Sequence, residues 1–225
     1  MKPIDIFNDR YEHLGTEDKK EAHRQGLWHR TFSALALNPI TRRIMLQKKA
    51  PGRYSFDRPD YADITVGGHY HAGETIPDGI REVHEELGLD IEYADLHPIG
   101  LRQTAVTLAP DYIEREFQHW HLLPLGIDLD AIPLADAEVS GLVDLDIDDA
   151  IALAEGAGDS VPARYATRTG TGLTYHEENS RVPTSSRTSS RSTSYTCASS
   201  LPRVDTARVN DDTSTGDRRH RWLSP

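Results

Sequence analysis

The segment from Gly67 to Leu89 constrains the fold more than any other part of the chain. The segment Asp63–Val66, which we expect to form a short strand, runs into two consecutive glycines, and a helical pattern follows them. Thr75 is suited to cap this helix, Pro77 to its first turn, and Gly88 to ending it in a left-handed conformation. We therefore expect a strand, a glycine-rich connection and a well-delimited helix in direct succession.

The predicted helix has two chemically different faces. At about 100° per residue, Glu82, Glu85 and Glu86 fall within an arc of roughly 100°. Carboxylates four residues apart repel one another in a helix, at a cost of roughly a few tenths of a kcal/mol. A hard divalent cation reverses this cost, and Mg²⁺ binds through carboxylates and substrate phosphates. The opposite face is apolar and predicts an anchor of three residues: Ile80, Val83 and Leu87.

This segment resembles the Nudix box, in which a glycine and a glutamate precede an Arg-Glu pair, a Glu-Glu pair and a final glycine at fixed spacing. Gly68 and Glu74 match the first part of the pattern. Six residues instead of seven separate Glu74 from Arg81, and we expect the shorter connection to be absorbed around Thr75–Gly79. The second part of the pattern is matched by Arg81, Glu82, Val83, Glu85, Glu86, Gly88 and Leu89.

Outside the box, the chain is similar to the Nudix branch that resembles isopentenyl-diphosphate isomerase. The similarity covers about residues 3–155 and implies an α/β fold, with a mixed β-sheet sandwiched between helices in an α/β/α arrangement. Four segments carry it: Trp28–Phe32, Leu46–Lys49, Asp63–Thr65 and Arg115–Phe117.

The resemblance implies a hydrolase that cleaves a diphosphate linkage in a nucleoside diphosphate derivative or a related compound, with Mg²⁺ or Mn²⁺ as cofactor. The implied metal ligands are Glu82, Glu85 and Glu86, and Arg81 is expected to orient one of these glutamates. Glu116 is a candidate for a further metal ligand or for the general base, with an exposed strand residue as the alternative. The candidate substrate contacts are Arg30, Lys48, Lys49, Gly68 and His69. For the three cationic residues, the alternative is that they are ordinary surface charges.

Two pairs of histidines, His69 with His71 and His119 with His121, are each two residues apart. Side chains with this spacing share one face of a strand, and histidine is a common transition-metal ligand. The sequence shows no fixed set of further ligands beside them. Polar packing or substrate contact is therefore the competing interpretation.

Two other functions remain as alternatives. His29 and His69 lie where isomerases of this fold place metal-binding histidines, but those isomerases also use a cysteine just before the Gly-His pair. This chain has Val66–Gly68 there, and its single cysteine is Cys197. The second alternative is a non-catalytic, Nudix-like nucleotide-binding module, which the shortened spacing favours and the retained carboxylates oppose.

Charge and composition divide the chain into two parts. Residues 1–180 carry a net charge of −15, whereas residues 181–225 carry +4 and are rich in Ser, Thr and Arg. We expect a Nudix domain over residues 1–155, with residues 1–27 as an N-terminal extension, and make no assignment for residues 156–180. For residues 181–225 we expect a disordered tail, either native or the product of a frameshift.

The net charge of −11 disfavours a nucleic-acid polymer or an anionic membrane as a partner. Without an apolar N-terminal run or a stretch of 18 apolar residues, we expect a cytoplasmic protein that acts on a small-molecule diphosphate. The oligomeric state stays open, and a homodimer is a reasonable assembly. Beyond the box we expect strands near 4–7, 31–37, 43–48, 96–103 and 116–123, and helices near 19–25 and 146–153.

Overall fold

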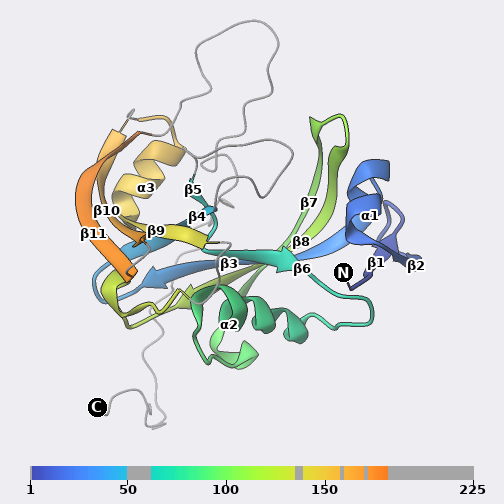
Figure 1. Ribbon diagram of the computed structural model, residues 1–225, viewed down its shortest axis with the longest axis horizontal. Coiled ribbons are helices and arrows are strands. Elements are labelled where there is room, and N and C mark those ends of the chain that lie inside the picture. The colour runs from blue at the N-terminus through green and yellow to red at the C-terminus, as the bar shows by residue number, and fades with distance from the viewer. Residues whose placement is uncertain (1, 50–61, 135–138, 158–159, 170–171, 182–225) are drawn as a thin grey trace, which may run out of the picture.

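A mixed β-sheet with helices on both faces forms the described part of the chain (Figure 1). The computed structural model describes residues 2–49, 62–134, 139–157, 160–169 and 172–181. Helix α2 lies against one face of the sheet, and α1 and α3 lie on the other side. This arrangement confirms the α/β fold with a mixed sheet between helices. Among the described residues, no helix has the length and apolar character needed to cross a membrane.

The elements follow one another as predicted through most of the domain. The helices are α1 (Lys19–Gln25), α2 (Arg81–Leu87) and α3 (Ile147–Ala154), and the 3-10 helices are η1 (Pro77–Ile80), η2 (Tyr93–Asp95) and η3 (Leu129–Ala131). The strands are β1 (Ile4–Phe7), β2 (His13–Glu17), β3 (Trp28–Asn38), β4 (Arg43–Lys49), β5 (Ala62–Asp63), β6 (Val66–His69), β7 (His97–Ala109), β8 (Tyr112–Pro124), β9 (Val139–Asp146), β10 (Ser160–Thr169) and β11 (Gly172–Arg181).

Strand β3 is the centre of the sheet. It pairs with β1, β4 and β6 in antiparallel fashion and with β8 in parallel, whereas the other pairs among the described residues are antiparallel. Phe32 and Ala34 pack into one core cluster together with Val83 of α2, while Leu35 packs into a second cluster together with Leu153 of α3. Full burial of a large apolar side chain contributes about 1.5–3 kcal/mol, so both faces of β3 anchor the fold.

Residues 156–180, which the sequence pattern left unassigned, largely form the antiparallel strands β10 and β11. Strand β10 extends the sheet beside β9, with Ala163 and Tyr165 buried against the second core cluster. Residues 50–61 and the predicted tail beyond residue 181, including Cys197, lie outside the described residues.

Candidate active site

The helix predicted as a single element is a 3-10 turn, η1, that continues directly into α2. A 3-10 turn rises about 2.0 Å per residue against about 1.5 Å in an α-helix, so it spans the same distance with fewer residues. Across this turn, Nε of Arg81 lies 3.1 Å from Oε1 of Glu74, so the two box residues are in contact despite the shortened spacing. Thr75 donates to the Asp78 carboxylate instead of accepting from the helix backbone, and Gly88 (φ 72°) ends α2.

Two consecutive glycines of β6, Gly67 and Gly68, each contact one carboxylate of α2. A Cβ atom at Gly68 would lie only 2.0 Å from Cδ of Glu82, so the Glu82 carboxylate rests directly on the strand backbone. Oε2 of Glu86 accepts hydrogen bonds from the Gly67 amide and from Nε2 of Gln47, each at 3.1 Å. Glu82 and Glu86 are consequently buried, on the same helix as the apolar anchor, and only Glu85 is exposed.

Arg81 gathers the carboxylates of this region around one guanidinium group. It donates to Glu82 at 3.0 Å and to Glu85 at 2.7 Å, and its Nη2 also donates to the His69 carbonyl at 3.2 Å. Burial raises the pKa of Glu82 to about 7; the Arg81 charge opposes this rise and the Glu86 charge adds to it. The Glu74 carboxyl is also partly buried, but hydrogen bonds from Arg81 and the His71 amide outweigh that burial and lower its pKa.

The donor set of α2 fits Mg²⁺. Glu82 and Glu86 crowd two buried carboxyl groups onto one stretch of strand, and the single Arg81 does not hold the pKa of Glu82 down. A divalent cation would relieve this crowding, and carboxylate oxygens are the ligands that Mg²⁺ prefers.

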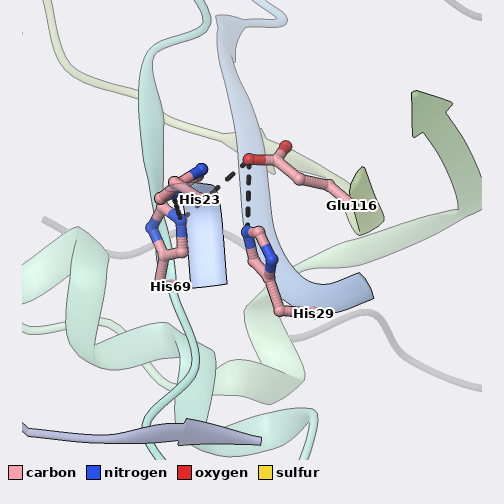
Figure 2. Close-up of side chains that lie close together, drawn as sticks. All are labelled: His23, His29, His69 and Glu116. Atoms are coloured by element: carbon pink, nitrogen blue, oxygen red, sulfur yellow. Dashed lines mark hydrogen bonds and ion pairs between the residues drawn. The ribbon is translucent and has the colours of Figure 1, made fainter. Parts of the chain in front are cut away.

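A second cluster of ligand-type side chains comes from four separate elements (Figure 2). His23 of α1, His29 of β3, His69 of β6 and Glu116 of β8 point toward one another, with one potential ligand atom of each within 4.8 Å of the others. Nε2 of His23 lies 3.0 Å from Nε2 of His69. Oε1 of Glu116 lies 3.7 Å from Nε2 of His29 and 4.0 Å from Nε2 of His69.

The hydrogen bonds of the histidine rings indicate that this cluster suits a metal ion. Nδ1 of His29 lies 2.8 Å from the Leu27 carbonyl and must carry the proton, because a carbonyl only accepts. Nε2 of His29 is buried, faces the Glu116 carboxylate at 3.7 Å, and has no hydrogen-bond partner among the described residues, so it is available to a metal ion. Burial lowers the pKa of His23 to about 4, assisted by the charge of His29, so His23 is in the neutral form that binds metals.

Three imidazoles and one carboxylate are a donor set for zinc or a similar transition metal. Zn–N distances of about 2.0–2.1 Å in a tetrahedron place two ligand nitrogens about 3.3 Å apart. Three separations within the cluster, 3.0, 3.7 and 4.0 Å, lie around this value, and all four ligand atoms lie within 4.8 Å of one another. The residues present therefore fit such an ion.

A protein-family model described as the NUDIX domain matches residues 27–164. The chain belongs to the Nudix family. Membership implies hydrolase activity on pyrophosphate-type bonds of small-molecule substrates, and Nudix enzymes generally use divalent metals.

Individual relatives include an uncharacterised Nudix hydrolase of Clostridium acetobutylicum, which is 32% identical over 148 residues, 65% of this chain and 70% of that protein. An isopentenyl-diphosphate Delta-isomerase of Burkholderia multivorans is 32% identical over 110 residues, 48% of this chain and 59% of the isomerase. Among solved structures, DR0079 from Deinococcus radiodurans is similar with a TM-score of 0.49 and 22% identity, over 70% of this chain and 90% of that one.

The residues predicted from the Nudix resemblance are divided between the α2 carboxylates and the histidine cluster. Arg81, Glu82, Glu85 and Glu86 lie together on α2, whereas Glu116 joins His29 and His69 in the histidine cluster. Gln118 donates to Oε2 of Glu116 at 2.8 Å, which leaves Oε1 of this carboxylate directed at the histidines. Burial alone would raise the pKa of Glu116, but His29 and the hydrogen bond from Gln118 outweigh it and lower the pKa.

Of the four histidines that the sequence places in two pairs, only one lies in the histidine cluster. His71 contacts Oε1 of Glu74, His119 contacts the Tyr11 hydroxyl, and His121 contacts the Tyr93 hydroxyl, so of these pairs only His69 belongs to the cluster. Sequence analysis missed His23, which lies in the predicted N-terminal helix. No motif surrounds it, and only the packing of α1 against β8 brings it to the cluster.

Arg30 and Lys48, two of the predicted cationic substrate contacts, lie outside both clusters. The Arg30 guanidinium lies over the rings of Phe7 and Tyr70, 5.2 Å from each centroid, and Nζ of Lys48 lies 5.2 Å from the centroid of the Tyr165 ring. The side chain of Lys49 is not among the described residues. Contact of these cations with a substrate phosphate therefore stays a prediction.

Proposed function

We propose that this Nudix protein is a Mg²⁺-dependent hydrolase that cleaves a diphosphate linkage in a nucleoside diphosphate derivative or a related compound. One observation carries the proposal: Glu82, Glu85 and Glu86 stand on one helix around Arg81, two of them buried on the backbone of Gly67 and Gly68. Such a carboxylate group matches the ligand preference of Mg²⁺ and the family's action on pyrophosphate-type bonds.

Some residues of the α2 site would bind the cation, and others hold the ligand side chains in position. Glu82, Glu85 and Glu86 would hold Mg²⁺, which when bound neutralises charge on the diphosphate oxygens and makes a coordinated water more acidic. Arg81 fixes the directions of the Glu82 and Glu85 carboxylates through its separate Nη atoms. Gln47 does the same for Glu86 from the neighbouring strand β4.

The histidine cluster would hold a second ion of the zinc or manganese class, with His23, His29, His69 and Glu116 as its ligands. Its nitrogen-rich donor set differs from the all-oxygen set of α2, so we expect the two sites to prefer different metals. Arg81 links the two sites directly, because it donates to the carbonyl of His69 while holding Glu82.

A panel of diphosphate compounds tests the proposal. The purified full chain is incubated with Mg²⁺ and with nucleoside triphosphates, ADP-ribose, dinucleoside polyphosphates or isoprenoid diphosphates, and released phosphate and nucleotide are measured. We expect turnover of at least one compound that is abolished by Glu86→Gln and unaffected by Glu155→Gln, a control at an exposed position. Binding of ligands with equal, negligible turnover in wild type and Glu86→Gln would instead identify a non-catalytic binding module.

An isomerase is the second candidate, favoured by the histidine cluster and by the similarity to isopentenyl-diphosphate isomerase. Against it, Gly67 and Gly68 stand where the resemblance to such isomerases requires a thiol beside His69. The same panel includes isopentenyl diphosphate, and chromatography separates the two outcomes. Conversion to dimethylallyl diphosphate without phosphate release would favour isomerisation over hydrolysis.

A further inference from the structure

Strand β1 lies before the residues that the NUDIX family model matches, yet it is bonded to the loop that leads into the catalytic helix. The carbonyl of Pro3 accepts a hydrogen bond from the amide of Ala72 at 2.8 Å. Two residues along the strand, Oδ2 of Asp5 accepts from the amide of Gly73 at 3.0 Å. Two consecutive loop residues, Ala72 and Gly73, are thus bonded to Pro3, just before β1, and to Asp5 within it.

A buried ion pair strengthens this attachment. The side chain of Asp5 is only 11% exposed, and its Oδ2 also accepts from Nη2 of Arg30 at 3.1 Å. The same Nη2 of Arg30 donates to the carbonyl of Glu74 at 2.7 Å. Because the guanidinium lies over both the Phe7 and the Tyr70 ring, 5.2 Å from each centroid, Arg30 has little freedom to leave this position.

The clamp formed by Asp5 and Arg30 connects to the metal-binding carboxylates through Glu74. The Glu74 carboxylate accepts from Arg81 at 3.1 and 3.3 Å, and Arg81 in turn donates to Glu82 and Glu85. The connection from Glu74 to Arg81 is one residue shorter than in the Nudix pattern. We therefore expect a displacement of the loop to displace the Arg81 side chain as well.

We propose that Asp5 is a positioning residue of the active site, which sets the spacing of the α2 carboxylates by fixing the loop over residues 72–74. The working catalytic unit of this chain then includes β1 as well as the family domain. This inference rests on the proposed function, since it takes Glu82, Glu85 and Glu86 to be Mg²⁺ ligands. A purely structural ion pair would alter stability and leave the Mg²⁺ requirement unchanged.

Asp5→Asn tests the clamp, because the side-chain amide keeps the shape of Asp5 while losing the charge that pairs with Arg30. We expect the Mg²⁺ concentration for half-maximal hydrolysis to rise about tenfold, at the lower end of the roughly 10–100-fold effects of outer-shell residues on metal affinity. The turnover number at saturating Mg²⁺ should stay within about twofold of wild type, because the ligands themselves are intact. Asp9→Asn, an exposed residue of the same N-terminal segment, should leave both values unchanged.

An unchanged Mg²⁺ requirement in an active Asp5→Asn variant overturns the proposal and leaves the hydrolase function standing. If wild type hydrolyses no compound of the panel, the proposed function fails, and calorimetric titration with Mg²⁺ alone decides about Asp5. Weaker Mg²⁺ binding by Asp5→Asn than by wild type supports the clamp, whereas equal binding or none in either protein overturns it.

If Asp5→Asn does not fold, Arg30→Lys replaces it, since one ammonium group cannot reproduce the planar guanidinium contacts. A raised Mg²⁺ requirement of this variant supports the clamp, and an unchanged one overturns it.

Discussion

The carboxylates of α2 and the histidine cluster are both metal-type sites, but they are assembled in opposite ways. The glutamates and Arg81 fall within one turn and a half of helix, so the periodicity of α2 alone brings them together. The histidine cluster draws on α1, β3, β6 and β8, and its geometry depends on strand register, with His29 opposite Glu116 and Thr31 opposite His69. A local motif can be recognised from spacing, whereas a cluster of this kind exists only after the sheet has formed.

The two sites also differ in charge. The α2 site concentrates negative charge that Arg81 offsets only in part, and the pKa of Glu82 rises to about 7 through burial. The cluster instead places three imidazole rings around one carboxylate. We therefore expect the α2 site to respond to Mg²⁺ and the cluster to retain a more tightly held transition metal, and each of the following experiments separates the two.

Glu86→Gln is expected to have the largest effect on activity. The amide can still accept the hydrogen bonds from Gly67 and Gln47 through its oxygen, so the fold is preserved while one charged ligand is lost. We expect hydrolysis to fall by at least about 100-fold, beyond the range typical of outer-shell residues. Steady-state rates measure this fall, and elemental analysis should show the transition-metal content unchanged. A loss of both would mean that the two sites are one.

Gly68→Ala should have the next largest effect. Its Cβ would collide with the Glu82 carboxylate at 2.0 Å and displace this ligand from the strand, so we expect a loss of about 10–100-fold in Mg²⁺ affinity. Gly67→Ala is the matched control, because its Cβ meets only the flexible end of Ile64, at 3.0 Å. Mg²⁺ titrations of activity compare the two variants. Equal effects would show that the carboxylate does not depend on the room at Gly68.

His29→Asn should act on the cluster alone. We expect the tightly bound transition metal to fall from about one ion per chain to a small fraction, because metal binding of this kind requires the complete ligand set. Hydrolysis at saturating Mg²⁺ should stay within about threefold. Elemental analysis and Mg²⁺ titration measure these quantities, with the exposed His84→Asn as the control. A collapse of hydrolysis together with metal loss would place the cluster in the reaction.

His119, which belongs to neither site, should have the smallest effect. Burial lowers its pKa to about 4, assisted by the charge of Arg30, against about 6.5 in an unfolded chain. The neutral ring, 2.7 Å from the Tyr11 hydroxyl, thus contributes stability that is present above about pH 6.5 and lost as the pH falls toward about 4.

Thermal unfolding at about pH 7 and about pH 5 measures this contribution. We expect the melting temperature of wild type to fall by about 2–4 °C more than that of His119→Gln between these two values. An equal fall in both proteins would mean that His119 is titrated alike in the folded and unfolded states.

Sequence patterns predicted the helices, the α2 motif and the strands β1, β3, β4, β7 and β8 because each depends on periodicity and on residues such as Gly88 that act locally, but they did not predict β2, β9, β10 or β11. They did not predict His23 as a partner of His69, since 46 residues separate the two and no spacing rule links α1 to β6. The attachment of β1 was missed for the same reason. Asp5 looked like an ordinary strand residue, and only the pairing of β1 with β3 places it beside Arg30 and the loop.

Strand β3 supplies His29 to the cluster, Arg30 to the clamp and Phe32 to the surface under η1, where a Cβ at Gly79 would lie 2.5 Å from the Phe32 ring. Consecutive residues of a strand face opposite sides of the sheet. Adding or deleting a single residue here would therefore turn all three side chains to the opposite face of the sheet at once. Point substitutions in β3 can therefore be compensated one by one during evolution, whereas changes in its length cannot. We expect related chains to vary in length in their loops and to keep the residue count of this strand.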